Sequence, residues 1–120
     1  MSAAKEYLQK QLCDLLDRAL IPPSWYTGFP AEGAHGRGCI GLKLGCGDIL
    51  MHIVVGNDYD AHDHSIWTEC KTGRGRLSDD QKDTRELLRQ ARVDYVEVRS
   101  LEEAITKWTD LGVPLRKVRI

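Results

Sequence analysis

The chain has 120 residues with 18 acidic and 17 basic side chains, which give a formal net charge of −1. This length allows one hydrophobic core, so we expect a single domain over residues 1–120. No apolar run approaches the length of a membrane span, and the first residues lack the apolar segment of a signal peptide. We therefore expect a cytoplasmic protein without a membrane partner.

A helix and an aromatic loop are expected first. Residues 3–20 place apolar side chains at spacings of three and four, which indicates an amphipathic helix, and Pro22 and Pro23 end it. Residues 24–38 are rich in Gly and Pro and predict a loop, followed by a short element over 39–44. The loop contains Trp25, Tyr26 and Phe29. Core packing is the favoured role of these aromatic residues, with base stacking and a dimer interface as alternatives.

A β-hairpin is expected next, with Asp48 immediately before its first strand. Residues 49–55 are apolar and rich in β-branched side chains, which favours a strand. Residues 56–64 are polar and predict the hairpin loop, and residues 66–71 predict the returning strand. Antiparallel pairing across this loop places Asp48 near Lys71 or Thr72.

The returning strand ends in Glu69-x-Lys71. Residues two apart on a strand share a face, so Glu69 and Lys71 project together with Trp67 beside them, and Ile66, Thr68 and Cys70 face the other way. The other acidic-x-Lys match, Asp80-x-Lys82, falls in the first turn of a helix, where such residues point in different directions. Asp48, Glu69 and Lys71 are therefore expected to converge at the open end of the hairpin.

This group of side chains has a chemical interpretation. Two carboxylates bind hard cations such as Mg²⁺ or Mn²⁺, and the backbone carbonyl of Cys70 lies between Glu69 and Lys71 as a further oxygen ligand. A metal there would polarise a phosphoryl oxygen and acidify a bound water, and Lys71 would orient that water or offset developing charge. The alternative is a solvated ion pair on an exposed strand face.

A basic helix follows the hairpin. Ser78 and Gln81 have the spacing of a capping box, with Ser78 as N-cap. The expected buried side of the helix comprises Leu77, Thr84, Leu87, Leu88 and Ala91. The basic residues of this region are Arg74 and Arg76 on a glycine-bearing turn, and Lys82, Arg85, Arg89 and Arg92 at spacings of three and four. Phosphate contact is favoured over a merely solvated face, although the net charge lacks the basic excess of most nucleic-acid-binding domains.

The C-terminal third is expected to be scaffold. Residues 93–98 predict a strand, and a capping box at Ser100 opens a helix that ends at Gly112. Residues 115–120 predict an edge strand. Trp108 is expected to be exposed and compatible with a dimer interface.

Two other groups of metal-ligand residue types receive structural interpretations. The cysteines have no zinc-like spacing, so free thiols are expected at Cys13, Cys39, Cys46 and Cys70. Residues 58–64 are rich in Asp and His, but they lack the glycine and terminal glutamate of a calcium loop, so a polar hairpin tip is favoured. The chain has no phosphate-binding P-loop, and no nucleotide cofactor is expected.

The stretch from Gly45 to Gln81 resembles the virus-type replication-repair nuclease (VRR-Nuc) domain of the PD-(D/E)xK superfamily. The shared pattern is Gly-x-Gly-Asp, a strand ending in Glu-x-Lys, and Gly-Arg-Leu-Ser-x-x-Gln. The resemblance extends to an N-terminal helix bearing Glu6 and to the later strand and helix. Two departures are Gly47, where the family has proline, and the stretch 91–93, where it usually has a glycine.

The resemblance implies a fold and a set of site residues. The fold would be α/β, with a restriction-endonuclease-like core in which helices flank a mixed sheet of four or five strands. Asp48, Glu69 and Lys71 would form the catalytic metal-binding set. Gln81 would approach the scissile phosphate or its water, and Glu6 would be an outer acidic contributor.

The resemblance also implies an activity. It would be Mg²⁺- or Mn²⁺-dependent hydrolysis of DNA phosphodiesters, on branched DNA of the Holliday-junction type, by a homodimer in a bacterial or phage-infected cell. The alternatives are a non-catalytic nucleic-acid-binding or assembly module that keeps the fold, and a nuclease acting on flaps or RNA ends.

Overall fold

The computed structural model describes residues 3–29, 48–56, 62–73 and 76–118, which form three helices and four strands. Along the chain these are α1 (Ala3–Ala19), β1 (Trp25–Gly28), β2 (Ile49–Val55), β3 (His62–Cys70), α3 (Asp79–Gln90), β4 (Asp94–Val98) and α4 (Leu101–Asp110). None of these helices is long and apolar enough to cross a membrane.

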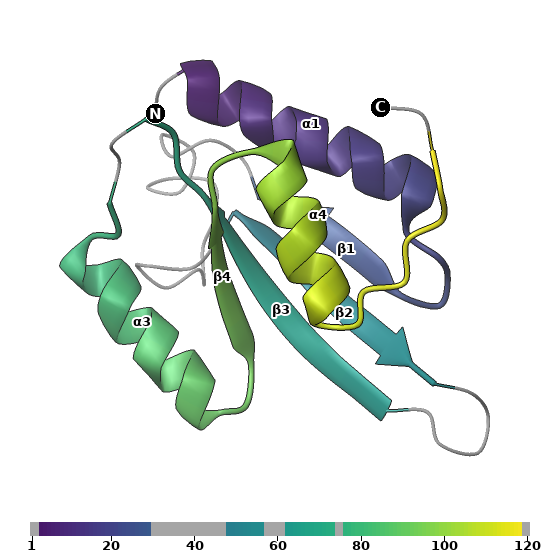
Figure 1. The fold of residues 1–120 in the computed structure, drawn as a ribbon. Coiled ribbons are helices and arrows are strands. Elements are labelled where there is room, and N and C mark those ends of the chain that lie inside the picture. Colours follow the sequence, from purple (N-terminus) through teal and green to yellow (C-terminus); the bar gives the residue numbers. More distant parts are fainter. Residues whose placement is uncertain (1–2, 30–47, 57–61, 74–75, 119–120) are drawn as a thin grey trace.

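The four strands form one mixed sheet in the order β1-β2-β3-β4 (Figure 1). The pairs β1–β2 and β2–β3 are antiparallel, and β3 pairs with β4 in parallel. Helix α3 lies between β3 and β4 in the sequence and provides the connection that a parallel pair requires. The predicted α/β fold with a mixed sheet and flanking helices is confirmed.

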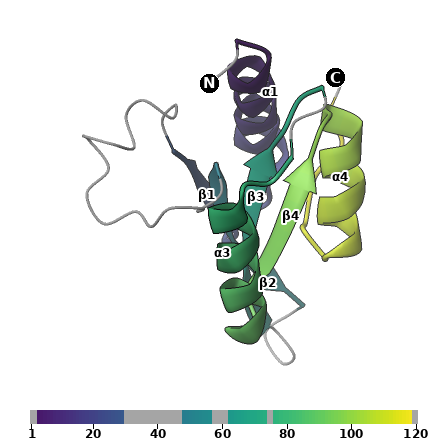
Figure 2. The same cartoon turned by 90° about the vertical axis from the view of Figure 1, so that its left-hand side faces the viewer.

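The hydrophobic core lies between one face of the sheet and the helices α1 and α4, while α3 packs on β4 away from this layer (Figures 1 and 2). Strands β2 and β3 alternate as expected for a half-covered sheet, and each presents every second residue to the core. The buried residues of the two strands on this face are Ile49, Met51, Ile53, Ile66, Thr68 and Cys70.

Trp108 is the largest fully buried side chain of the described residues. Its indole Nε1–H donates to Thr68 Oγ1 at 3.0 Å, which satisfies both polar groups in the core. The prediction that Trp108 is exposed is therefore wrong. Helix α4 turns this residue toward the sheet, and only the docking of α4 on the sheet determines that direction.

Two strand predictions need correction. Trp25–Gly28 forms strand β1 instead of a loop, in keeping with its aromatic and β-branched residues. Strand β3 begins at His62, before the predicted start at residue 66, and the hairpin pairs Val55 with His62 and Ile49 with Thr68. Polar residues therefore continue the ladder, because backbone groups and not side chains make its hydrogen bonds.

Helix α3 is less buried than predicted. Its capping box is present at Ser78, but none of its side chains is buried, and Leu87 is 60% exposed. The helix ends before Arg92, whose φ of 63° is the left-handed conformation that glycine adopts most easily. Of the predicted buried side, Leu77 is buried and Thr84 and Leu88 are half-buried, whereas the prediction is wrong for Leu87 and Ala91, which are exposed.

The predictions at the remaining segments have separate outcomes. Leu115 forms an isolated bridge to Leu20, so the described residues 115–118 do not extend into an edge strand. The short element predicted over 39–44 lies outside the described residues. Cys13 and Cys70 are free thiols, as predicted, whereas Cys39 and Cys46 also lie outside.

Candidate active site

Asp48 and Glu69 lie side by side at one end of the β2–β3 hairpin, where they are 2% and 1% exposed. The Asp48 N–H donates to the Thr68 carbonyl at 2.8 Å, and the Cys70 N–H donates to Asp48 Oδ2 at 2.8 Å. The backbone of β3 therefore holds Asp48 opposite Glu69. The sequence analysis predicted that Asp48 lies near Lys71 or Thr72, which is about two residues too far along the chain. The predicted convergence of Asp48 and Glu69 tolerates a difference of this size.

Gln81 and Lys5 donate hydrogen bonds to one oxygen of Glu69, and Lys71 forms an ion pair with the same oxygen. Glu69 Oε1 lies 2.7 Å from Gln81 Nε2, 3.0 Å from Lys5 Nζ and 3.5 Å from Lys71 Nζ. Lys71 extends the line of β3 and donates its own N–H to the Val98 carbonyl at 2.9 Å, so β4 fixes its backbone. The structure brings together all four predicted catalytic residues: Asp48, Glu69, Lys71 and Gln81.

Gln81 combines a structural and a site contact. Its Oε1 accepts from the Ser78 N–H at 2.8 Å, and its own N–H donates to Ser78 Oγ at 3.1 Å, which completes the capping box. The other half of the same amide donates to Glu69. The N-terminus of α3 is thus attached to the carboxylate pair through one side chain.

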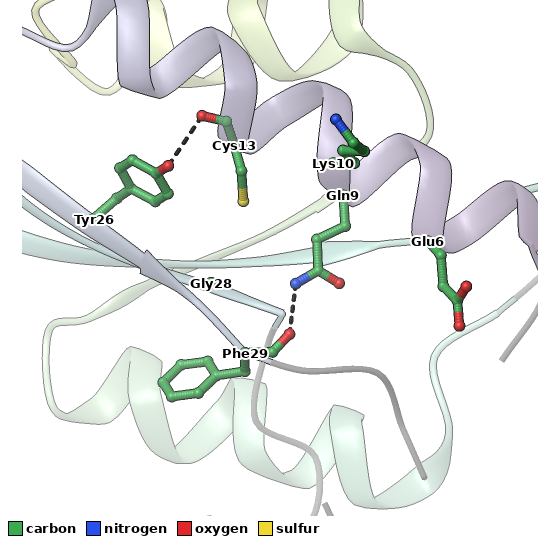
Figure 3. A pocket seen from close by; sticks show the side chains of 7 residues that line it. All are labelled: Glu6, Gln9, Lys10, Cys13, Tyr26, Gly28 and Phe29. Carbon is green, nitrogen blue, oxygen red and sulfur yellow. Dashed lines mark hydrogen bonds between the residues drawn. The ribbon is translucent and has the colours of Figure 1, made fainter. Parts of the chain in front are cut away.

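Lys5 of α1 is a site residue that the sequence analysis missed. Its ammonium lies 3.0 Å from Glu69 Oε1 and 3.4 Å from Asp48 Oδ2, and its side chain is 17% exposed. A signal was present, because Lys5 precedes the buried Leu8 and Leu12 by three and seven residues and so shares their helix face. The exposed Glu6 points instead into a neighbouring hollow, and no ion pair or hydrogen bond of the described residues connects it to the carboxylates (Figure 3).

Burial is the largest single influence on the pKa of Glu69, Lys5 and Cys70. It raises the pKa of Glu69 to about 7, the charge of Asp48 adds to the rise, and Lys5 and Lys71 oppose it. Burial lowers the pKa of Lys5, but Asp48 and Glu69 outweigh this effect and leave it above its ordinary value. Burial also raises the pKa of the Cys70 thiol far above its usual range, so Cys70 is not a nucleophile at neutral pH.

A hollow of about 570 Å³ lies between α1 and β1 (Figure 3). Gln9 crosses this region, and its Nε2 donates to the Phe29 carbonyl at 2.6 Å and to the Asp48 carbonyl at 3.3 Å. The Phe29 ring stacks on Trp67 at a centroid distance of 5.4 Å. The residues lining the hollow are Glu6, Gln9, Lys10, Cys13, Tyr26, Gly28 and Phe29.

The predicted phosphate-contacting residues lie on and before α3. Ser78 is at the N-cap, and the basic side chains are exposed at Arg76, Lys82, Arg85 and Arg89. Arg89 pairs with Glu86 at 3.6 Å, and this solvated contact leaves its charge accessible. Arg74 lies outside the described residues.

The donor set fits a hard divalent cation that keeps part of its water shell. Among residues 3–29, 48–56, 62–73 and 76–118, no group of three or more Asp, Glu, His or Cys side chains has the arrangement of a metal site. Mg²⁺ requires fewer protein ligands than this, because it is commonly bound through one or two carboxylates plus waters and substrate oxygens. Asp48 and Glu69 provide two carboxylates, and a bound cation would offset the burial and the Asp48 charge that raise the pKa of Glu69.

Two histidines of the hairpin, His52 and His64, form separate pairs with carboxylates. His52 Nε2 lies 3.4 Å from Asp63, and His64 Nδ1 lies 3.2 Å from Asp94. Each ring therefore has its own carboxylate, and Asp63 and His64 lie within strand β3 instead of in the predicted hairpin tip. Residues 57–61 of the predicted tip lie outside the described residues.

Comparison with known proteins identifies the fold. No family model and no curated protein matches the chain. The solved structure of a "VRR_NUC domain protein" is similar, with a TM-score of 0.68 and 17% sequence identity, over 92% of this chain and 88% of that chain. At this identity the likeness establishes the fold alone, and it agrees with the pattern from Gly45 to Gln81. The chain has the fold of a VRR-Nuc domain.

Proposed function

We propose that this protein is a Mg²⁺- or Mn²⁺-dependent DNA endonuclease that acts on branched DNA of the Holliday-junction type. The observation that carries the proposal is the meeting of Asp48, Glu69, Lys71 and Gln81 at one end of the hairpin. Two buried carboxylates with an adjacent ammonium match the needs of phosphodiester hydrolysis, in which negative charge develops on the phosphoryl oxygens.

The metal would be held by Asp48 and Glu69, with the Cys70 carbonyl as a further oxygen ligand. When bound, it would supply an acidified water and charge neutralisation at the phosphate. Asp48 is pre-oriented for this role by the Cys70 N–H. Gln81, in the first turn of α3, donates a hydrogen bond to Glu69 and would lie beside the substrate phosphate.

Lys71 would act on the reacting groups directly. Its side chain is 15% exposed, so its ammonium is partly desolvated while it remains next to Glu69. A positioned ammonium at this place would orient the attacking water or stabilise the charge that develops on the phosphate. The exposed basic residues of α3 would contact neighbouring phosphates, which position DNA without reading its sequence.

Cleavage of labelled DNA tests the proposal. The panel contains a four-way junction, a flap, a duplex and single-stranded DNA, each with Mg²⁺, Mn²⁺ or EDTA. Wild type should make paired nicks in the junction only with metal, and Lys71→Met should lose cleavage while retaining its fold and most DNA binding. Lys117→Met is a matched control, because it removes an exposed lysine near the C-terminus. Equal cleavage by Lys71→Met and wild type would contradict the assignment of Lys71.

Cleavage of a junction at two strands would require two active sites, so we propose a homodimer. Trp25, half exposed on the edge strand β1, is available to such an interface, whereas the buried Trp108 is not. The mass in solution, measured by light scattering with and without a four-way junction, tests this assembly. A monomer that nicks both strands symmetrically would contradict it.

One observation favours the alternative of a non-catalytic nucleic-acid-binding module. The Lys5 ammonium contacts both carboxylates and offsets part of their negative charge. A binding module would retain affinity for DNA, cleave none of the four substrates in any metal, and show no effect of Lys71→Met beyond binding.

A further inference from the structure

Lys5 lies where the charge of the two carboxylates is concentrated. Its Nζ is 3.0 Å from Glu69 Oε1 and 3.4 Å from Asp48 Oδ2, and both acidic side chains are at most 3% exposed. The ion pair of Lys71, at 3.5 Å, is with Glu69. Lys5 is therefore the cation that bridges the pair.

A bridging ammonium and a divalent cation exclude each other. A metal bound through Asp48 and Glu69 would lie about 2 Å from their oxygens, next to the position that Lys5 Nζ takes. Like charges this close in a buried site repel strongly. The lysine has a flexible four-carbon stem at the N-terminal end of α1 and can move outward by rotation of its side chain.

We propose that Lys5 is a built-in counter-ion that occupies the cation position between Asp48 and Glu69 until a divalent metal displaces it. The inference rests on the proposed metal site and adds a regulatory contact to it. In the metal-free protein, Lys5 keeps two buried carboxylates compensated, which avoids the cost of an unpaired buried charge. On metal binding, the released ammonium becomes available to a phosphate at the same site.

The size of the effect follows from the occupancy of the contact. The apparent dissociation constant of a ligand equals its intrinsic value divided by the fraction of protein that is competent to bind it. If Lys5 contacts the carboxylates about 90% of the time, about 10% of the protein is competent, and metal binding is about tenfold weaker. Removal of the Lys5 charge should therefore tighten metal binding by about tenfold or more.

The test is the Mn²⁺ dissociation constant of the full chain, measured by titration calorimetry at physiological ionic strength. Lys5→Met removes the charge and keeps most of the hydrocarbon stem. Lys10→Met is the matched control, because it removes the same charge from the same helix, where Lys10 pairs with Asp14 in solvent. We expect tighter binding in Lys5→Met, unchanged binding in Lys10→Met, and loss of the tight binding when Asp48→Asn is added to Lys5→Met.

The outcomes separate this inference from the proposed function. Equal or weaker Mn²⁺ binding by Lys5→Met, with measurable binding by wild type, overturns the role of Lys5 and leaves the metal site in place. Absence of Mn²⁺ binding by both proteins overturns the role of Lys5 and the metal site together. Binding by Lys5→Met alone supports the inference in its strongest form.

Loss of the counter-ion also affects folding, which provides a second readout. Lys5→Met should be less stable than wild type in EDTA and should recover more stability than wild type when Mn²⁺ is added, because metal bound to the folded state stabilises it by mass action. Lys5→Gln, which retains a hydrogen-bond donor for Glu69, serves if Lys5→Met does not fold in EDTA. An identical Mn²⁺-induced increase in Tm for wild type and Lys5→Gln would overturn the inference.

Discussion

The proton affinity of Glu69 predicts an unusual dependence of stability on pH. Its pKa rises from 4.5 to about 7 in the folded protein, chiefly through burial and the charge of Asp48. Between these values the unfolded chain has lost this proton while the folded chain retains it. The folded state then binds more protons, so its stability falls as the pH rises from 4.5 to 7 and levels off above 7.

The magnitude follows from the same interval. One pH unit is worth about 1.4 kcal/mol for one proton, so the rise from 4.5 to about 7 corresponds to about 3 kcal/mol. Glu69→Gln cannot titrate and should lack this fall. Relative to wild type, the variant should therefore gain about 3 kcal/mol in its free energy of unfolding between pH 4.5 and pH 8.

Urea unfolding in EDTA, followed by circular dichroism across this pH range, measures the effect. Glu102→Gln is the matched control, because Glu102 is exposed in the first turn of α4 and its replacement should leave the pH profile of wild type unchanged. Profiles of Glu69→Gln and wild type that run parallel across the range would refute the reasoning about the buried pair.

Three further predictions concern the contacts around the site and are measured as free energies of unfolding in EDTA. Asp48→Ala should be less stable than Asp48→Asn by about 1–3 kcal/mol, because it leaves the buried Cys70 N–H without its acceptor; equal stability would show that this N–H finds another partner. Trp108→Phe and Thr68→Val should be coupled by about 1 kcal/mol in a double-mutant cycle, because each removes one partner of the same buried hydrogen bond; strict additivity would contradict this. Ser78→Ala should cost about 1 kcal/mol through loss of the N-cap, and no loss would mean that Gln81 alone holds the first turn of α3.

Local patterns in the sequence were sufficient for several features. Alternation along residues 66–71 indicated that Ile66, Thr68 and Cys70 share one face of the strand, because side chains on a strand alternate whatever surrounds them. The capping box at Ser78 and Gln81 was predictable for the same reason, since both partners lie within one helical turn. The approach of Asp48 to Glu69 followed from hairpin topology and was insensitive to the register.

Other features depended on how separate elements dock. The burial of Trp108 follows from the docking of α4 on the sheet. Its hydrogen-bond partner Thr68 lies on β3, 40 residues earlier in the chain. Leu87 is exposed because the packing of α3 on β4 leaves this side chain in solvent. Periodicity identifies an apolar side chain on a helix, but not whether a neighbouring element covers it.

The sequence by itself determined the chemistry available to this protein, namely two carboxylates and a lysine on one hairpin and a glutamine at the start of the following helix. Only the tertiary structure placed Lys5 between the carboxylates, 64 residues from Glu69 along the chain. The physical reason is that the packing of α1 on the sheet determines which carboxylates Lys5 contacts. The spacing of residues along the sequence does not specify how two separate elements pack.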